Sequence, residues 1–192
     1  MRIAKIERKT KETDILIELN IDGSGVGDID TGIGFFDHML NLMAFHGSFD
    51  LKVICKGDLH IDDHHTVEDI GIALGQAFYQ AIGDRKGIKR YSNIYIPMDE
   101  ALGLAVVDIS NRPYLVFNVD FKGDRLGTMS TQNFKEFFRA FADKAGVTLH
   151  INSLYGENDH HKIEGIFKAF SRALKDAAQI VSEDIPSTKG ML

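Results

Sequence analysis

The chain has 192 residues, 44% of them hydrophobic, which is enough to bury a substantial core in one domain. Its net charge of −6 argues against a general nucleic-acid binder, and no apolar run approaches the roughly 18–20 residues of a membrane span. The N-terminus has no apolar stretch of the signal-peptide type, and the single Cys55 excludes an intrachain disulfide. We therefore expect a cytoplasmic protein that binds neither nucleic acid nor a membrane.

Alternating apolar residues predict strands in both halves of the chain. In chain order the expected strands are Ile3–Arg8, Ile15–Ile21, Leu51–Cys55, Ile94–Pro97, Leu102–Asp108, Tyr114–Val119 and Val147–Ile151. Apolar residues at helical spacing predict two shorter helices, over about 34–46 and 131–145. They also predict two longer helices that begin at His64 and His160, the first of which ends at Gly83.

The sequence contains an internal repeat. Residues 64–68 read His-His-Thr-Val-Glu, and residues 160–164 read His-His-Lys-Ile-Glu, 96 positions later, which is half of the chain. Each motif opens a long helical pattern and follows a shorter helix and a set of strands. The repeat predicts a single α+β domain made of two similar halves, about 1–90 and 91–192, each a small sheet with two helices on one face.

The repeated motifs have the spacing of metal ligands. Residues i and i+4 share one face of a helix, so His64 can bind an ion together with Glu68, whereas His65 points elsewhere and can reach a second ion. The motif at 160–164 repeats this arrangement. Four imidazoles and two carboxylates suit Mn, Fe, Zn, Co or Ni. One such motif alone would more often be structural or solvated, but its repetition favours a site for two ions.

Two further residues occupy comparable places in the shorter helices. His38 follows Phe35, Phe36 and Asp37, and Glu136 precedes Phe137. From the residues alone, His38 fits a helix-surface histidine as well as a ligand, and Glu136 fits an ordinary exposed carboxylate.

Seven short segments together resemble one known family. They are Gly34–Leu40, Asp62–Asp69, Pro97–Ala101, Asp108–Tyr114, Asn158–Glu164, Phe167–Phe170 and Pro186–Gly190. The family that they resemble is imidazoleglycerol-phosphate dehydratase. The matches run in order along essentially the whole chain, and the paired His-His-x-x-Glu motifs with a C-terminal Ser-Thr-Lys-Gly are a highly specific combination.

The resemblance implies a duplicated fold like the second domain of ribosomal protein S5. Each half would be a four-stranded sheet with two helices, and the helices would pack between the sheets. It also implies a homo-oligomer of 24 subunits with two manganese ions per active site. The implied reaction is that of a carbon–oxygen lyase of L-histidine biosynthesis, which converts D-erythro-imidazole-glycerol phosphate to imidazole-acetol phosphate and water.

The resemblance also assigns the site residues. The implied metal ligands are His38, His64, His65, Glu68, Glu136, His160, His161 and Glu164. The implied substrate-binding residues are Glu12, His46, Arg90, Arg112, Lys168, Ser187, Thr188 and Lys189. Arginine forks, hydroxyl groups and a lysine suit phosphate oxygens, although a chain end would otherwise be expected to fray.

The chemistry of the implied reaction requires a base. The proton lost is not next to a carbonyl, so the imidazole ring must take up charge, and two metal ions would favour a di-manganese-bound imidazolate that expels the adjacent hydroxyl. A carboxylate must then remove the proton from carbon. We predict Glu164 in this role, because its helix face points at the metal ions, with Glu12 as the other candidate.

Two other functions stay open at this point. A different di-metal hydrolase would act on a phosphorylated substrate through a metal-bound water, and release of inorganic phosphate would support it. A non-enzymatic metal-binding assembly would need only the histidines. Arg90, Arg112 and the Ser-Thr-Lys segment argue against it, because storing metal requires no phosphate-binding groups.

Overall fold

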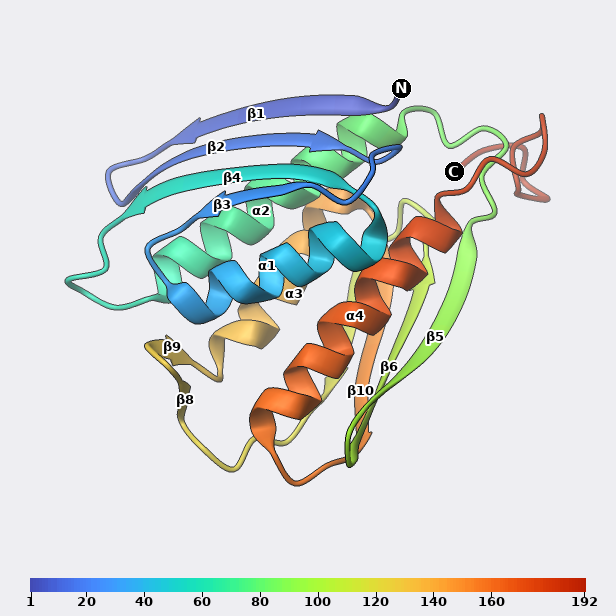
Figure 1. Cartoon of the computed structure of the whole chain (residues 1–192). Helices are drawn as coiled ribbons and strands as arrows, with labels where there is room; N and C mark the ends of the chain where they lie inside the picture. The colour runs from blue at the N-terminus through green and yellow to red at the C-terminus, as the bar shows by residue number, and fades with distance from the viewer.

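The computed structural model describes residues 1–192 and contains two four-stranded sheets with four helices between them (Figure 1). The elements in chain order are β1 (Ile3–Lys9), β2 (Thr13–Asn20), β3 (Gly27–Asp30), α1 (Gly34–Gly47), β4 (Asp50–Gly57), α2 (His64–Ile82), β5 (Tyr91–Met98), β6 (Ala101–Asp108), β7 (Tyr114–Asn118), β8 (Arg125–Leu126), β9 (Met129–Ser130), α3 (Asn133–Ala145), β10 (Thr148–Tyr155) and α4 (Asp159–Ala177). The predicted α+β class and the four helices are confirmed.

The two large sheets share one topology. Their strand orders are β1-β2-β4-β3 and β5-β6-β10-β7, and in each the outer pair (β3 with β4, β7 with β10) is parallel while the other pairs are antiparallel. The element order β-β-β-α-β-α therefore occurs twice, as the repeat predicts. Sequence alternation did not find β3, which is short and mostly exposed, nor the hairpin of β8 and β9 that the second half inserts before α3.

The helices meet across the middle of the molecule. In β2, Ile15, Ile17 and Leu19 are buried on the face that α2 covers, while Asp14 and Glu18 point to the exposed face. In the centre, α2 packs against α3 and α1 packs against α4, so each contact joins the two halves (Figure 1). None of the four helices combines the length and apolar character needed to span a membrane.

Aromatic side chains fill the space between the halves. Phe137 of α3 stacks on Phe167 of α4 with ring centroids 5.6 Å apart, and it meets Phe36 of α1 edge-on at 5.3 Å. All three side chains are fully buried. Burying one such ring contributes about 1.5–3 kcal/mol to folding, so this cluster helps to hold α1 and α4 in fixed positions.

Two glycines set the distance between α2 and α3. A Cβ at Gly75 would lie 2.7 Å from the carbonyl oxygen of Phe141 and 3.1 Å from the amide nitrogen of Ala145. A Cβ at Gly71 would lie 2.8 Å from the carbonyl oxygen of Phe137. The nearest obstructing atom at each position belongs to the backbone, so a larger residue at either position would force the two helices apart.

Cys55 of β4 lies inside the core. Burial, with the nearby carboxylate of Asp69, raises the pKa of its thiol to about 12. The side chain is therefore protonated at neutral pH and packs as a small apolar residue.

We expect Gly75→Ala to lower the free energy of unfolding by about 1–3 kcal/mol, the usual cost of overpacking a core. Helix propensity alone would favour alanine by about 1 kcal/mol. A decrease in the free energy of unfolding would therefore show that the close approach of α2 and α3 outweighs helix propensity. Urea unfolding measures the change. The control is Gly34→Ala, because a Cβ at Gly34 has no neighbour within 4 Å. A Gly75→Ala protein at least as stable as wild type would contradict this account.

Candidate metal centre

Both histidine pairs lie in the first turn of a long helix. The carboxylate of Asp62 accepts a hydrogen bond from the backbone N–H of His64 at 2.8 Å. The side-chain oxygen of Asn158 caps α4 by accepting from the N–H groups of His160 and His161. The Asn158 cap and the hydrogen bond to Asp62 hold the first turns of α4 and α2 in place, so the backbone helps to set the direction of each ring.

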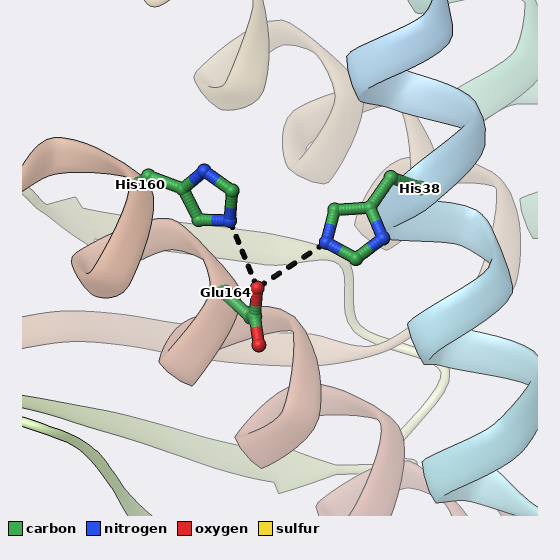
Figure 2. Close-up of side chains that lie close together, drawn as sticks. All are labelled: His38, His160 and Glu164. Carbon is green, nitrogen blue, oxygen red and sulfur yellow. Dashed lines mark hydrogen bonds and ion pairs between the residues drawn. The ribbon is translucent and has the colours of Figure 1, made fainter.

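The first cluster joins α1 to α4 and consists of His38, His160 and Glu164 (Figure 2). Nε2 of His38 lies 3.2 Å from Oε2 of Glu164, and Nε2 of His160 lies 2.9 Å from the same oxygen. The three ligand atoms lie within 4.8 Å of one another. His38 comes from the first half of the chain and the other two residues from the second, so this α1–α4 cluster exists only because the halves pack together.

Glu164 is a carboxylate under all ordinary conditions. Burial by itself raises the pKa of Glu164, but hydrogen bonds from Lys168, His160 and His38 outweigh it and lower that pKa to about 2. Nζ of Lys168 lies 2.6 Å from Oε1 of Glu164. The other oxygen faces the two imidazoles, so the carboxylate has one oxygen for the lysine and one for a metal ion.

A second group, the α2–α3 cluster, consists of His64, Glu68 and Glu136, and its two carboxylates are linked through Arg139. Nε2 of His64 lies 3.5 Å from Oε2 of Glu68, and Nδ1 of His64 lies 3.2 Å from the side-chain oxygen of Asn133. The guanidinium of Arg139 pairs with both carboxylates, at 3.0 Å from Glu68, and so occupies the space between them.

The two clusters are related by the internal duplication. The pair His64 and Glu68 corresponds to His160 and Glu164, and Glu136 stands where the first half has His38. Each cluster takes one residue from the shorter helix of one half and two from the longer helix of the other half. The i, i+4 pairs lie together as the spacing predicts, and the fold brings His38 to the second pair, whereas Glu136 is joined to Glu68 through Arg139.

The second histidine of each pair turns away from its cluster. In the first half, the ring centroids of His64 and His65 are 6.0 Å apart. Nδ1 of His65 lies 3.0 Å from the carboxylate of Asp58, and its Nε2 lies 3.8 Å from the carboxylate of Glu12. The hydrogen bond with Asp58 raises the pKa of His65.

His161 has the same kind of surroundings. Its Nδ1 lies 2.7 Å from Glu100, and its Nε2 lies 3.8 Å from Asp99. The hydrogen bond with Glu100 raises the pKa of His161. Hydrogen bonds from the backbone N–H of Asn158 and from His161, together with the N–H of Glu157, lower the pKa of Glu100 to about 2.

The phosphate-binding residues expected from sequence gather at the other end of α4. Arg90 pairs with Asp108 through two nitrogens, at 2.8 and 3.3 Å, and donates to the carbonyl oxygen of Pro186 at 2.8 Å. The structure thereby brings Arg90 next to the C-terminal segment that carries Ser187, Thr188 and Lys189. Arg112 lies 3.5 Å from the same Asp108, and its side chain is 63% exposed, so its guanidinium is accessible to a ligand.

His46 lies at the opposite end of α1 from His38. Burial, with the nearby charges of Lys168 and Arg172, lowers the pKa of His46, which is therefore neutral at physiological pH. Lys168 thus lies between this histidine and the α1–α4 cluster. The sequence assigned no role to Arg172.

Several residues of the site were missed from sequence. Asp99 and Glu100 lie in the segment Pro97–Ala101, which matches the family, but no role was inferred for them. Asp58 carries no local signal. Arg139 stands three positions after Glu136, a spacing that predicts an ion pair between them on a helix.

The donor set fits a transition-metal ion. The α1–α4 cluster offers two imidazole nitrogens and one carboxylate oxygen that converge on one point, and Glu164 is only 7% exposed. Imidazole with carboxylate suits Mn, Fe, Zn or Ni, and an ion here would take over contacts now made by hydrogen bonds. In the α2–α3 cluster the same space holds Arg139, so an ion would have to displace a guanidinium.

Known proteins share this sequence and this fold. The model of the family described as imidazoleglycerol-phosphate dehydratase matches residues 31–174. The chain belongs to the imidazoleglycerol-phosphate dehydratase family. It is 71% identical over 192 residues to the imidazoleglycerol-phosphate dehydratase of Clostridioides difficile (strain 630), covering all of both chains. It is 62% identical over 191 residues to that of Caldicellulosiruptor saccharolyticus, covering 100% of this chain and 98% of the relative.

Solved structures of the family have the same fold. The crystal structure of imidazoleglycerol-phosphate dehydratase from Staphylococcus aureus aligns with a TM-score of 0.83 at 45% identity, over 91% of this chain and 97% of that one. A structure of the Pyrococcus furiosus protein in complex with (S)-C348 aligns with a TM-score of 0.85 at 40% identity, over 97% and 100%. Membership makes this protein a dehydratase of histidine biosynthesis, from a metal-dependent family that acts on a phosphorylated substrate.

We expect Arg139→Gln to tighten manganese binding at the α2–α3 cluster. The guanidinium is a cation that competes with the ion for Glu68 and Glu136, and a half-exposed pair of this kind is worth up to about 1 kcal/mol, or roughly fivefold in affinity. Isothermal titration with Mn²⁺ measures the change. Lys135→Gln removes the same charge from the same helix without touching either glutamate and should leave affinity unchanged. Equal affinities in all three proteins would contradict the competition.

Proposed function

We propose that the protein converts D-erythro-imidazole-glycerol phosphate to imidazole-acetol phosphate and water, a step of L-histidine biosynthesis. It would use two manganese ions per active site and act in the cytoplasm as a homo-oligomer of 24 subunits. The observation that carries this proposal is the α1–α4 cluster, in which His38, His160 and Glu164 converge in a chain of this family.

The chain would provide metal ligands in two ways: in two clusters within the chain, and as two histidines that face outward. His38, His160 and Glu164 would hold one ion, and His64, Glu68 and Glu136 would hold the other. His65 and His161 face away from both clusters, so each would complete a metal site together with another chain. Bound manganese would supply Lewis-acid stabilisation of the negative charge that develops on the imidazole ring.

The length of α4 supports a site shared between chains. Arg90, which we assign to phosphate binding, lies at the C-terminal end of α4, because its backbone N–H donates to the carbonyl oxygen of Ala177. Glu164 lies 13 residues earlier, about 20 Å along the helix. The three carbons between ring and phosphate of the substrate cannot cover that distance. The ring and the phosphate must therefore contact different chains, which favours an obligate oligomer.

Among the residues that we assign to phosphate binding, some anchor the C-terminal segment and others can contact the phosphate itself. Arg90 is almost fully buried, and its ion pair with Asp108 and bond to Pro186 anchor the C-terminal segment. Arg112 and Lys189 are exposed and can offer charged donors to phosphate oxygens. The hydroxyls of Ser187 and Thr188 would add neutral donors from the same turn.

The geometry supports Glu12 rather than Glu164 as the base that removes the proton from carbon. A carboxylate whose pKa is held near 2 is a weak base, and Glu164 is already engaged by Lys168 and two histidines. Glu12 is half exposed, and Nε2 of His65, at 3.8 Å, is too far away to form a hydrogen bond with its carboxylate. Its carboxylate can therefore approach a substrate bound beside that histidine.

The decisive assay is dehydration of imidazole-glycerol phosphate by manganese-loaded protein, with a chelator-treated sample as the control. We expect imidazole-acetol phosphate to form with manganese and none above background without it. Release of inorganic phosphate would instead favour the hydrolase. Tight manganese binding without any turnover would favour the metal-binding assembly. Sedimentation of the same sample tests for 24 copies of the 21.4 kDa chain.

Two variants separate ligand from base. We expect Glu12→Gln to lower kcat by at least about 100-fold, the scale of general-base loss, with manganese affinity unchanged. Glu164→Gln should lower both kcat and manganese affinity, because it removes a ligand of the α1–α4 cluster. Both should keep phosphate binding, since that group lies elsewhere. A nearly full rate for Glu12→Gln would return the role of base to Glu164.

A further inference from the structure

Two carboxylates outside the metal clusters contact the outward-facing histidines in the same way. Asp58 lies 3.0 Å from Nδ1 of His65, and Glu100 lies 2.7 Å from Nδ1 of His161. In both histidines the other nitrogen, Nε2, lies 3.8 Å from its nearest carboxylate, too far for a hydrogen bond. One ring nitrogen is thus engaged in each half, and the other remains available.

We propose that Asp58 and Glu100 are positioning residues that keep the proton of His65 and His161 on Nδ1 and so leave Nε2 free to bind a metal ion. A carboxylate only accepts hydrogen bonds, so the nitrogen that faces it must be the donor. A neutral imidazole with its proton on Nδ1 has its lone pair on Nε2. This inference rests on the metal binding of the proposed function.

The two carboxylates lie in loops that are not equivalent in the two halves. Asp58 lies in the loop between β4 and α2, whereas Glu100 lies in the turn between β5 and β6. The 96-residue repeat does not relate these two positions, although it does relate His65 to His161. Two unrelated loops therefore supply the same partner to equivalent histidines, which points to a requirement of the histidine rather than of the loop.

The contacts of Asp58 also support a role in positioning His65. Its Oδ1 is buried and accepts no hydrogen bond, which costs free energy in a folded protein. The hydrogen bond that Oδ2 accepts from His65 is the interaction that this partly buried carboxylate makes with a side chain. A purely structural carboxylate would be expected to use both oxygens.

The surroundings of Glu100 make a sharp test possible. Its Oε1 accepts from the backbone N–H groups of Glu157 and Asn158, at 3.0 and 2.8 Å, while Oε2 faces His161. In Glu100→Gln the single carbonyl oxygen would stay with the two backbone donors. The amide NH₂ would then face Nδ1 of His161, which must become an acceptor, and its proton would move to Nε2, where the metal ion should bind.

Asn and Ala at position 58 should behave differently from each other. The side-chain oxygen of Asp58→Asn can rotate toward Nδ1 of His65, because no backbone donor holds it elsewhere, so the acceptor is kept. Asp58→Ala removes the acceptor altogether. We therefore expect weak metal binding in Glu100→Gln and Asp58→Ala, and rescue in Asp58→Asn.

The experiment is a Mn²⁺ titration of the assembled protein, read from the electron paramagnetic resonance signal of the free ion. Glu100→Gln and Asp58→Ala should bind about 10- to 100-fold more weakly than wild type, the usual effect of losing the partner of a ligating histidine. Asp58→Asn should stay within about threefold of wild type. Glu157→Gln and Asp30→Asn each remove one exposed charge without contacting a histidine and should bind as wild type does.

The outcomes are distinct. Wild-type affinity in Glu100→Gln, with the variant correctly assembled, would overturn this inference and leave the proposed function standing. Wild-type protein that takes up no manganese would overturn both. Should Glu100→Gln fail to assemble, the Asp58→Ala and Asp58→Asn pair decides: equal affinity in these two variants would overturn the inference, and weaker binding in Asp58→Ala alone would support it.

Discussion

The packing of helices across the two halves is the constraint on which the rest of the structure depends. Each half alone would cover one face of its sheet with two helices and leave the outer sides of those helices exposed to water. Pairing α1 with α4 and α2 with α3 buries both sets in one continuous core. Each helix pair joins one helix from each half. Each cluster therefore contains residues of both halves, and neither half could form a cluster alone.

The two halves share one backbone fold but differ in the charged residues that surround their clusters. In both clusters a basic side chain pairs with the carboxylates. In the second half it is Lys168, one turn after Glu164 on the same helix. The first half has Ile72 at the corresponding place, and Arg139 of the neighbouring helix takes over. Two similar sites therefore hold their carboxylates in different ways, and they should differ in how readily they exchange a metal ion.

The rigid helices also separate the two kinds of chemistry. In our proposal the metal ligands of α2 and α4 lie near the N-terminal ends of these helices, and the phosphate-binding group lies past the C-terminal end of α4. A substrate smaller than the helix cannot contact both ends of one chain. Assembly with other copies is therefore part of the chemistry in our proposal, and the two outward-facing histidines are the side chains best placed to cross such a contact.

The sequence by itself determined the features that repeat over short distances: the alternation of the strands, the helical spacing and the pairing of His64 with Glu68 and of His160 with Glu164. The tertiary structure decided which helices meet, and therefore that His38 joins Glu164 across 126 positions, Arg139 joins Glu68 across 71 and Glu100 joins His161 across 61. The spacing predicts Glu164 as a ligand, but the low pKa that weakens it as a base comes from neighbours on two helices. The reason is physical. Periodicity follows from the local geometry of the backbone, so a short segment reveals it. Which side chains of different elements meet depends on how the apolar faces of those elements pack together, and a short segment does not show this.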